Sequence, residues 1–237
     1  MIEAVLFDLD DTLYDQRQWL DGAWRAVAAR AADWGIDPIG LERALRAVAE
    51  VGSDRGGIID QALALVGARD VPAGPLVAAF RAYRPARLEP YPGVDRALTR
   101  LSARVPLGLV TDGEPDGQRS KLAALGLVDY FATAIFSDEH GRAHRKPDPL
   151  PFRLAVAELG VRASRAVFVG DRPEKDVAGP ARLGMRAIRV RTGEWRAEPD
   201  DPRAMATVDT VEQAVDLVEL ELDQHQPLDV LPGRPAA

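Results

Sequence analysis

From residue 91 onward, the sequence alternates between short apolar segments and longer amphipathic ones. The apolar segments have the length and composition of strands, and the segments between them have the periodicity of helices. Alternation at these lengths predicts βαβ units, a parallel sheet and right-handed crossover connections. The expected strands are 106–111, 133–137, 166–170 and 187–190, and the expected helices are 92–101, 116–125, 149–159, 174–183 and 211–222.

The N-terminal part has two different patterns. Residues 2–9 form a nearly continuous apolar run, as expected for a strand buried on both faces of a parallel sheet. Residues 16–87 show helical periodicity only, with breaks at Gly, Asp and Pro residues. We therefore predict an α/β protein that contains an inserted all-helical block. The expected division is a core of residues 1–15 and 88–224, the insertion at 16–87, and a mobile tail at 225–237.

Composition narrows the classes of function and partner. The chain has 237 residues and a formal net charge of −7, and no dense run of Lys and Arg suggests a nucleic-acid partner. It has no cysteine, which excludes disulfides, thiolate catalysis and Cys-ligated metals. No apolar stretch approaches the ~20 residues needed to cross a bilayer, and no signal-peptide pattern opens the chain. We expect a cytoplasmic monomer or homodimer that binds neither nucleic acid nor membrane.

Polar residues stand directly after each predicted strand. In an open parallel sheet, ligands bind beyond the carboxyl ends of the strands, so these positions are candidates for a site. They are Asp8, Asp10, Asp11 and Thr12 after the first strand, Thr111, Asp112 and Gly113 after the second, Lys146 beyond the third, and Asp171 and Asp176 after the fourth. Carboxylates, a hydroxyl and a lysine are thus expected at one edge of the sheet.

This set of side chains fits phosphoryl transfer. Asp8 and Asp10 are two positions apart and can share one side of an extended segment. One carboxylate can attack phosphorus, while the other protonates the leaving oxygen and later activates water, which gives an aspartyl-phosphate intermediate. Two carboxylates facing a phosphate need a cation, and Mg²⁺ held by Asp8 and Asp171 would supply it.

The remaining strand-end residues can bind the phosphoryl group. Thr111 and the backbone N–H groups near Gly113 can donate to its oxygens, and Lys146 can stabilise charge in the transition state. Taken singly, each residue has a simpler explanation: an Asp at a strand end is most often a turn or cap residue, and Lys146 could be a solvated surface lysine. The whole set in this order is difficult to explain by turn chemistry alone.

The chain resembles the haloacid dehalogenase superfamily at four motifs: Phe7-Asp8-Leu9-Asp10-Asp11-Thr12-Leu13, Thr111, Lys146-Pro147-Asp148-Pro149, and Gly170-Asp171 followed by Asp176. The resemblance implies a Rossmann-like core with a helical cap inserted after the first strand. It implies Mg²⁺ as cofactor and assigns each residue a role. These roles are nucleophile for Asp8, general acid/base for Asp10, phosphoryl contacts for Thr111 and Lys146, and metal binding for Asp8, Asp10, Asp171 and Asp176.

Position 112 departs from the commoner family pattern, which has Asn after the Ser or Thr of the second motif. A carboxylate at Asp112 should weaken phosphate binding unless it is paired. We therefore expect Asp112 to pair with a basic side chain and to shape its loop, the candidates being Arg145, Arg119 and Lys121.

Substrate specificity is expected to come from the cap. Arg17 and Arg55 are its candidate substrate contacts, and Arg55 is favoured because Gly56 and Gly57 allow close approach of a ligand. Trp19 and Trp24 are expected to pack within the cap.

The expected function is Mg²⁺-dependent hydrolysis of a small phosphorylated metabolite, such as a sugar phosphate, a nucleotide or a small acid phosphate. Two alternatives remain open: a phosphomutase of the beta-phosphoglucomutase type, and a non-catalytic binding protein on the same fold. Dehalogenation is disfavoured, because relatives with that activity lack the second carboxylate that Asp10 supplies here.

Overall fold

A six-stranded parallel sheet forms the centre of the larger part of the molecule. The computed structural model describes residues 1–224. The strands lie in the order β3-β2-β1-β4-β5-β6, and every pairing is parallel. Their bounds are β1 Ala4–Phe7, β2 Leu107–Thr111, β3 Thr133–Phe136, β4 Ala166–Gly170, β5 Arg186–Val190 and β6 Ala206–Val208. All residues of β1, β2 and β4 are buried, as expected for strands covered on both faces.

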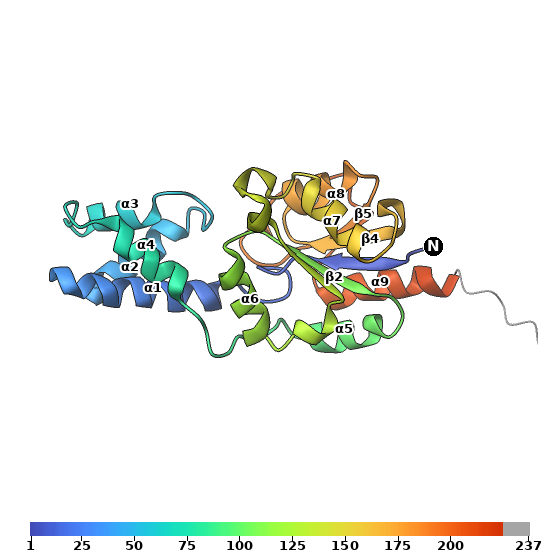
Figure 1. Cartoon of the computed structure of the whole chain (residues 1–237), viewed down its shortest axis with the longest axis horizontal. Coiled ribbons are helices and arrows are strands. Elements are labelled where there is room, and N and C mark those ends of the chain that lie inside the picture. Colours follow the sequence, from blue (N-terminus) through green and yellow to red (C-terminus); the bar gives the residue numbers. More distant parts are fainter. Residues whose placement is uncertain (225–237) are drawn as a thin grey trace, which may run out of the picture.

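Helices cover both faces of this sheet. Alternate residues of β1 face opposite sides: Val5 and Phe7 join one apolar cluster and Leu6 joins the other. In Figure 1, α7 (Leu150–Glu158) and α8 (Gly179–Ala181) lie on one side of the sheet, and α5 (Val94–Ser102) and α9 (Val211–Gln224) lie on the other. The chain therefore has an α/β fold with a three-layered, Rossmann-like core.

Four helices gather at the other end of the molecule (Figure 1) and form what we call the helical cap. They are α1 (Arg17–Ala31), extended by a 3₁₀ turn at Ala32–Trp34, then α2 (Pro38–Ala49), α3 (Ile58–Leu65) and α4 (Ala73–Ala82). Trp24 stacks on Phe80 with ring centroids 4.6 Å apart, and Trp19 meets Phe80 edge-on at 5.0 Å. Both tryptophans are buried, as expected from the sequence.

The two chain crossings between core and cap lie side by side. Tyr14 forms isolated bridges with Asp10 and Pro90. Gln18 donates from Nε2 to the Glu89 carbonyl and accepts from the Glu89 N–H, both at 2.9 Å. The division into two domains, with a core of residues 1–15 and 88–224 and a cap of residues 16–87, stays a prediction.

Three segments differ from the sequence-based expectation. The helix expected at 174–183 is a π-helical turn, Pro173–Ala178, followed by short α8, because Pro180 has no N–H to continue a regular ladder. The edge strand β6 was not expected, since three half-buried residues are too short to show a period. The expected mobile tail at 225–237 lies outside the described residues.

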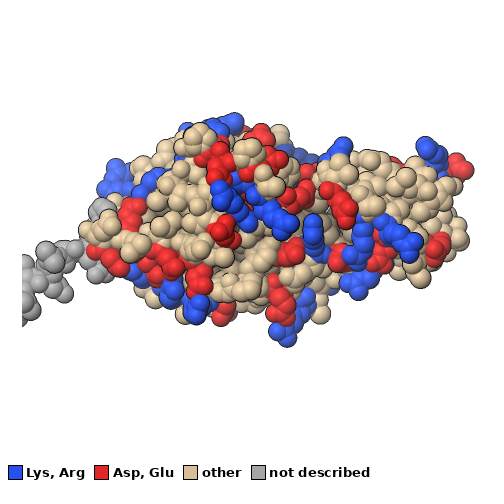
Figure 2. Space-filling view, turned by 180° about the vertical axis from the view of Figure 1, so that it is seen from behind, with Lys and Arg blue, Asp and Glu red and all other residues tan. Residues whose placement is uncertain are grey.

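Among residues 1–224, no helix combines the length and the apolar character needed to cross a membrane. Figure 2 shows positive and negative side chains interspersed over one face of the molecule. Ion pairs also join the core helices α5 and α9, such as Arg100 with Asp216 at 2.5 Å.

Candidate active site

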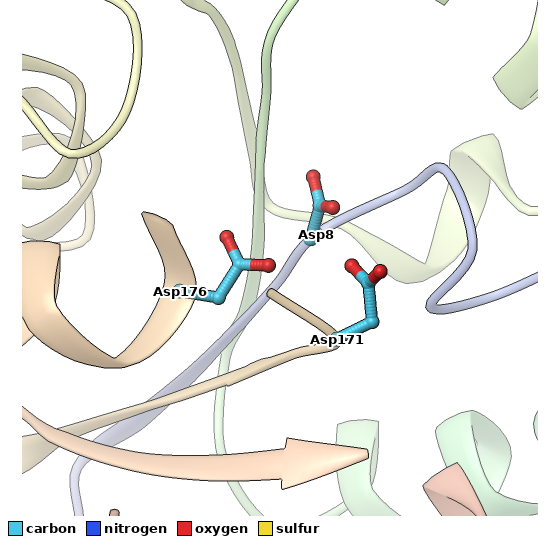
Figure 3. Close-up of side chains that lie close together, drawn as sticks. All are labelled: Asp8, Asp171 and Asp176. Atoms are coloured by element: carbon cyan, nitrogen blue, oxygen red, sulfur yellow. The ribbon is translucent and has the colours of Figure 1, made fainter. Parts of the chain in front are cut away.

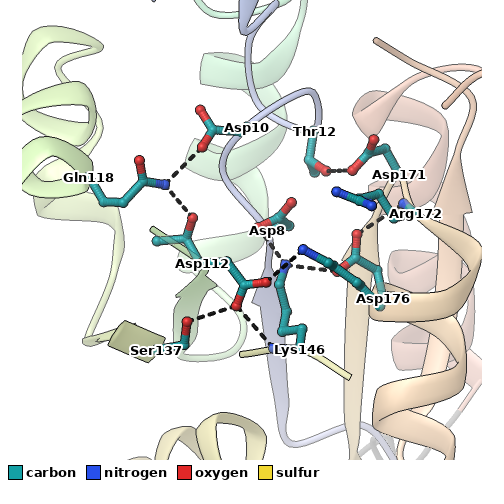
Figure 4. A network of polar contacts seen from close by, with 12 residues as sticks. Asp8, Asp10, Thr12, Asp112, Gln118, Ser137, Lys146, Asp171, Arg172 and Asp176 are labelled. Atoms are coloured by element: carbon teal, nitrogen blue, oxygen red, sulfur yellow. Dashed lines mark hydrogen bonds and ion pairs between the residues drawn. The ribbon is translucent and has the colours of Figure 1, made fainter. Parts of the chain in front are cut away.

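The strand-end residues singled out in the sequence come together at the carboxyl edge of the sheet (Figure 4). Asp8 follows β1, Thr111 ends β2, and Asp171 follows β4. Lys146 reaches the same place from the loop beyond β3, and Asp176 comes from the turn after Asp171. All five side chains are buried.

The three carboxylates among these side chains form a cluster that could bind a metal ion. Asp8, Asp171 and Asp176 each offer an oxygen, and these oxygens lie within 4.8 Å of one another (Figure 3). Burial, with Asp176 close by, raises the pKa of Asp8 to about 7, although Lys146 opposes the shift. Burial and the charges of Asp176 and Asp8 raise the pKa of Asp171 well above its usual range. Buried carboxylate oxygens short of positive charge are the ligands that Mg²⁺ prefers.

Lys146 is the cation of this cluster. Its Nζ lies 2.6 Å from Asp8 Oδ1 and 2.8 Å from Asp176 Oδ1. Burial alone would lower the pKa of Lys146, but the charges of Asp176 and Asp8 outweigh burial and raise it. Lys146 therefore carries its charge at neutral pH. Among residues 1–224 it is the only basic side chain that forms an ion pair with these three carboxylates.

Asp10 is held apart from the cluster by donors on three sides. Tyr14 donates to Oδ1 at 2.6 Å, and Gln118 donates to Oδ2 at 2.8 Å. Lys121 Nζ lies 2.8 Å from Oδ1 and 2.9 Å from Oδ2. Burial alone would raise the pKa of Asp10, but Lys121 and the hydrogen bonds outweigh burial and lower it. Asp10 is thus a carboxylate in this arrangement.

The helix α6 (Pro115–Ala124) supplies two of these donors, and the sequence analysis did not assign them to Asp10. Gln118 also contacts Thr111, with its Nε2 2.6 Å from the Thr111 Oγ1. Gln118 and Lys121 are three positions apart, so they share one face of the helix. That spacing, on the helix that directly follows Thr111, is the signal that could have identified them.

The partners expected for Asp112 were wrong, although its carboxylate is indeed paired. Asp112 accepts hydrogen bonds from Ser137 Oγ at 2.7 Å and from the Lys146 N–H at 3.0 Å, and it binds Lys175 Nζ at 3.0 Å. The basic residues expected there bind other acids: Arg145 binds Asp138, Arg119 binds Glu139, and Lys121 binds Asp10. Lys175 was missed because only the turn after Asp171 brings it across to the β2 loop.

A cavity of about 360 Å³ lies between this edge of the sheet and the cap. Its core side includes Asp8, Thr111, Gly113 and Lys146, and its cap side includes Trp19, Trp24, Arg55, Ile58, Phe80 and Arg81. Arg55 thus lies where the sequence analysis placed it. Arg17 does not line the cavity: it is exposed at the start of α1, so its expected role as a substrate contact is not supported.

Comparison with known proteins identifies the protein family. Residues 2–184 match the family model of the haloacid dehalogenase-like hydrolases, and the chain belongs to this family. A glyceraldehyde 3-phosphate phosphatase of Methanocaldococcus jannaschii is 31% identical over 227 residues, which cover 92% of this chain and 97% of the relative. A phosphoserine phosphatase of Thermus thermophilus is 40% identical over 184 residues, which cover 77% of this chain and 68% of the relative.

Solved structures of this family share the fold. A haloacid dehalogenase-like phosphatase of Thermococcus onnurineus superposes with a TM-score of 0.64 at 24% identity, covering 92% of this chain and 98% of that one. A 2-haloacid dehalogenase of Pseudomonas syringae superposes with a TM-score of 0.65 at 29% identity, covering 93% and 100%. The curated relatives cited above are phosphatases, and this chain is a phosphatase of the same superfamily. Neither relative supports the phosphomutase alternative.

Proposed function

We propose that this chain hydrolyses phosphomonoesters of small metabolites, with Mg²⁺ and through an aspartyl-phosphate on Asp8. The observation that carries the proposal is the buried cluster of Asp8, Asp171 and Asp176, which has Lys146 as its only basic ion-pair partner within residues 1–224. A divalent cation bound by these oxygens would offset the remaining charge and let an anionic nucleophile approach an anionic phosphate. The three carboxylates offer the hard oxygen ligands that such an ion requires.

Two displacements at phosphorus make up the reaction. In the first, a carboxylate oxygen of Asp8 forms a bond to phosphorus, the ester P–O bond breaks, and Asp10 protonates the leaving oxygen. In the second, water attacks the phosphorus of the aspartyl-phosphate, Asp10 accepts its proton, and Asp8 and inorganic phosphate are released. The lowered pKa of Asp10 favours its ionised form, which is the form that the second step needs.

Neighbouring groups would bind and orient the phosphoryl group. Thr111 and the backbone at Gly113 line the cavity beside Asp8, and Lys146 supplies a fixed positive charge next to the nucleophile. The charge of Asp112 is already compensated by Lys175, so it repels the substrate less than an unpaired carboxylate would.

The cavity fits a small substrate with a polar distal part. A volume of about 360 Å³ is at the lower end of the range for small-molecule sites. Arg55, Arg81 and Arg142 line it, and within residues 1–224 none of the three has a carboxylate within ion-pair distance. These arginines are available to a ligand. The relatives act on glyceraldehyde 3-phosphate and phosphoserine by name, and we infer a phosphorylated metabolite of similar size for this chain.

The test is phosphate release from a panel of sugar phosphates, nucleotides and small acid phosphates, with Mg²⁺ or with EDTA. We expect Mg²⁺-dependent release from wild-type protein and from Asp129→Asn, an exposed control outside the cavity. We expect none from Asp8→Asn. Activity that persists in Asp8→Asn, or in EDTA, would contradict the proposal.

A further inference from the structure

The loop that follows β5, residues 191–200, contacts the cap through Glu194. The Ser53 hydroxyl donates to Glu194 Oε2 at 2.6 Å, and the Ser53 N–H lies 3.1 Å from Oε1 and 3.3 Å from Oε2. Ser53 stands in the cap, between α2 and α3. Beside it, Asp54 binds Arg172 at 2.7 Å, and the Arg172 guanidinium lies 4.0 Å from the ring centroid of Trp195. The loop is therefore the surface on which this part of the cap rests.

The same loop also forms hydrogen bonds with Asp11, the residue after the proposed acid/base, in what we call the catalytic segment, residues 10–16. The Glu194 N–H donates to Asp11 Oδ2 at 3.0 Å, and the Thr192 hydroxyl donates to the Asp11 carbonyl. Asp11 has a φ of 57°, in the left-handed region that non-glycine residues rarely adopt. These bonds stabilise an otherwise unfavourable backbone conformation at the residue next to Asp10.

Contact between the loop and Asp11 leaves no room for a side chain at position 193. Gly193 has a φ of 60°, and a Cβ built on it would lie 2.1 Å from Asp11 Cγ. Only glycine fits both the conformation and the space.

A buried arginine binds the part of the loop that follows Glu194. Arg189 of β5 is fully buried and donates to the carbonyls of Trp195 at 2.8 Å, Glu198 at 2.8 Å and Pro199 at 2.9 Å. It also donates to the Asp171 carbonyl at 3.3 Å. With its backbone fixed in this way, the loop can transmit a displacement at one end to the other.

We propose that Glu194 is a positioning residue that links the closed position of the cap to the conformation of the catalytic segment 10–16. Ser53 orients the Glu194 carboxylate, and the Glu194 backbone holds Asp11, so Asp10 reaches its working position when the cap is closed. The link concerns the site of the proposed function, but hydrogen exchange can test it without any assay of activity.

The first experiment compares hydrogen exchange in wild type, Ser53→Ala and Glu194→Ala. We expect exchange in segment 10–16 to accelerate in both variants, more in Glu194→Ala, although among the described residues the Ser53 side chain forms its hydrogen bond with Glu194 and not with that segment. Glu198→Ala is the matched control, because only the backbone of Glu198 contributes to the loop contacts. Acceleration confined to residues 51–57 and 191–200 would overturn the proposal.

The second experiment separates positioning from simple cap binding by kinetics. We expect Glu194→Ala to lower kcat by roughly tenfold and Ser53→Ala by less, with the double variant no worse than Glu194→Ala. Glu194→Gln, which can still accept from Ser53, should recover part of the loss. A rise in KM alone, or additive effects of the two substitutions, would show that Glu194 only binds the cap and does not position the catalytic segment. If the protein has no phosphatase activity, the exchange experiment still decides.

Discussion

At the scale of single residues, Lys146 contacts two buried carboxylates, so its removal leaves uncompensated charge in the core. Breaking a buried ion pair by deleting one partner costs about 3–5 kcal/mol. We expect Lys146→Met to lose stability of this order in EDTA, measured by urea unfolding, and to recover part of it with Mg²⁺. We also expect phosphate release to fall at least about a hundredfold. Lys175→Met, which removes a cation at the more exposed rim, should lose much less stability; equal losses would contradict this account.

The shifted pKa values of Asp8 and Asp171 make the metal-free protein sensitive to pH. Asp8 has a pKa of about 7 in the folded chain, against about 4 when unfolded, so between these values the folded state binds more protons. Stability contributed by such a group falls as pH rises through this window. A bound metal must displace these protons, so Mg²⁺ affinity should rise with pH up to about 7 and somewhat beyond.

Thermal unfolding from about pH 5 to about pH 8, in EDTA and in Mg²⁺, measures both effects. We expect the Tm gained from Mg²⁺ to increase with pH, and this increase to be smaller in Asp8→Asn. A gain from Mg²⁺ that is independent of pH would show that the cluster is already ionised without the metal.

At the scale of elements, the junction between β4 and the turn after it determines where Asp176 lies. A Cβ on Gly170 would lie 2.5 Å from Asp176 Cβ, so Gly170→Ala must push Asp176 away from Asp8 and Asp171. We expect Mg²⁺ binding, measured by calorimetry, to weaken by at least about tenfold. Gly74→Ala in α4 is the control, because a Cβ there meets nothing within 4 Å. Unchanged Mg²⁺ affinity in Gly170→Ala would argue against Asp176 as part of the metal site.

The elements and the edge at which they converge could be predicted from the sequence. The signals for these are local: apolar runs define β1, β2 and β4, and parallel strands necessarily bring their following residues to one edge. The convergence of Asp8, Thr111 and Asp171 follows from this rule. Their catalytic roles stay predictions.

Side-chain partners could not be predicted in the same way. Asp112 binds Lys175, and Lys121 binds Asp10, because loop geometry decides which of several basic residues comes within reach. The contacts of Glu194 could not be predicted either, because a polar segment rich in Pro indicates only a loop. Its contacts with Ser53 and Asp11 join segments distant in sequence, and no periodicity reports them.

At the scale of the whole molecule, we predict that the paired crossings near Tyr14 and Pro90 act as a hinge between core and cap. The Gln18–Glu89 hydrogen bonds tie the two crossings together, so they should move as one unit. We expect residues 14–16 and 87–92 to exchange amide hydrogens more slowly when a phosphate analogue is bound. No difference between free and bound protein would speak against a hinge at this place.

The contacts between this side of the cap and the core should contribute little energy, because those described are polar and partly exposed. The Asp54–Arg172 pair has side chains 43% and 20% exposed, and pairs of this kind contribute about 0.2–1 kcal/mol. The stacking of Arg172 on Trp195 adds a similar amount. A cap held this weakly can open for substrate and close again within a catalytic cycle.

We therefore expect Arg172→Gln to raise KM by no more than about tenfold and to leave the fold intact. Arg165→Gln is the control, because Arg165 forms an ion pair with Glu3 within the core. A rise in KM of more than a hundredfold would mean that Arg172 contacts the substrate rather than the cap.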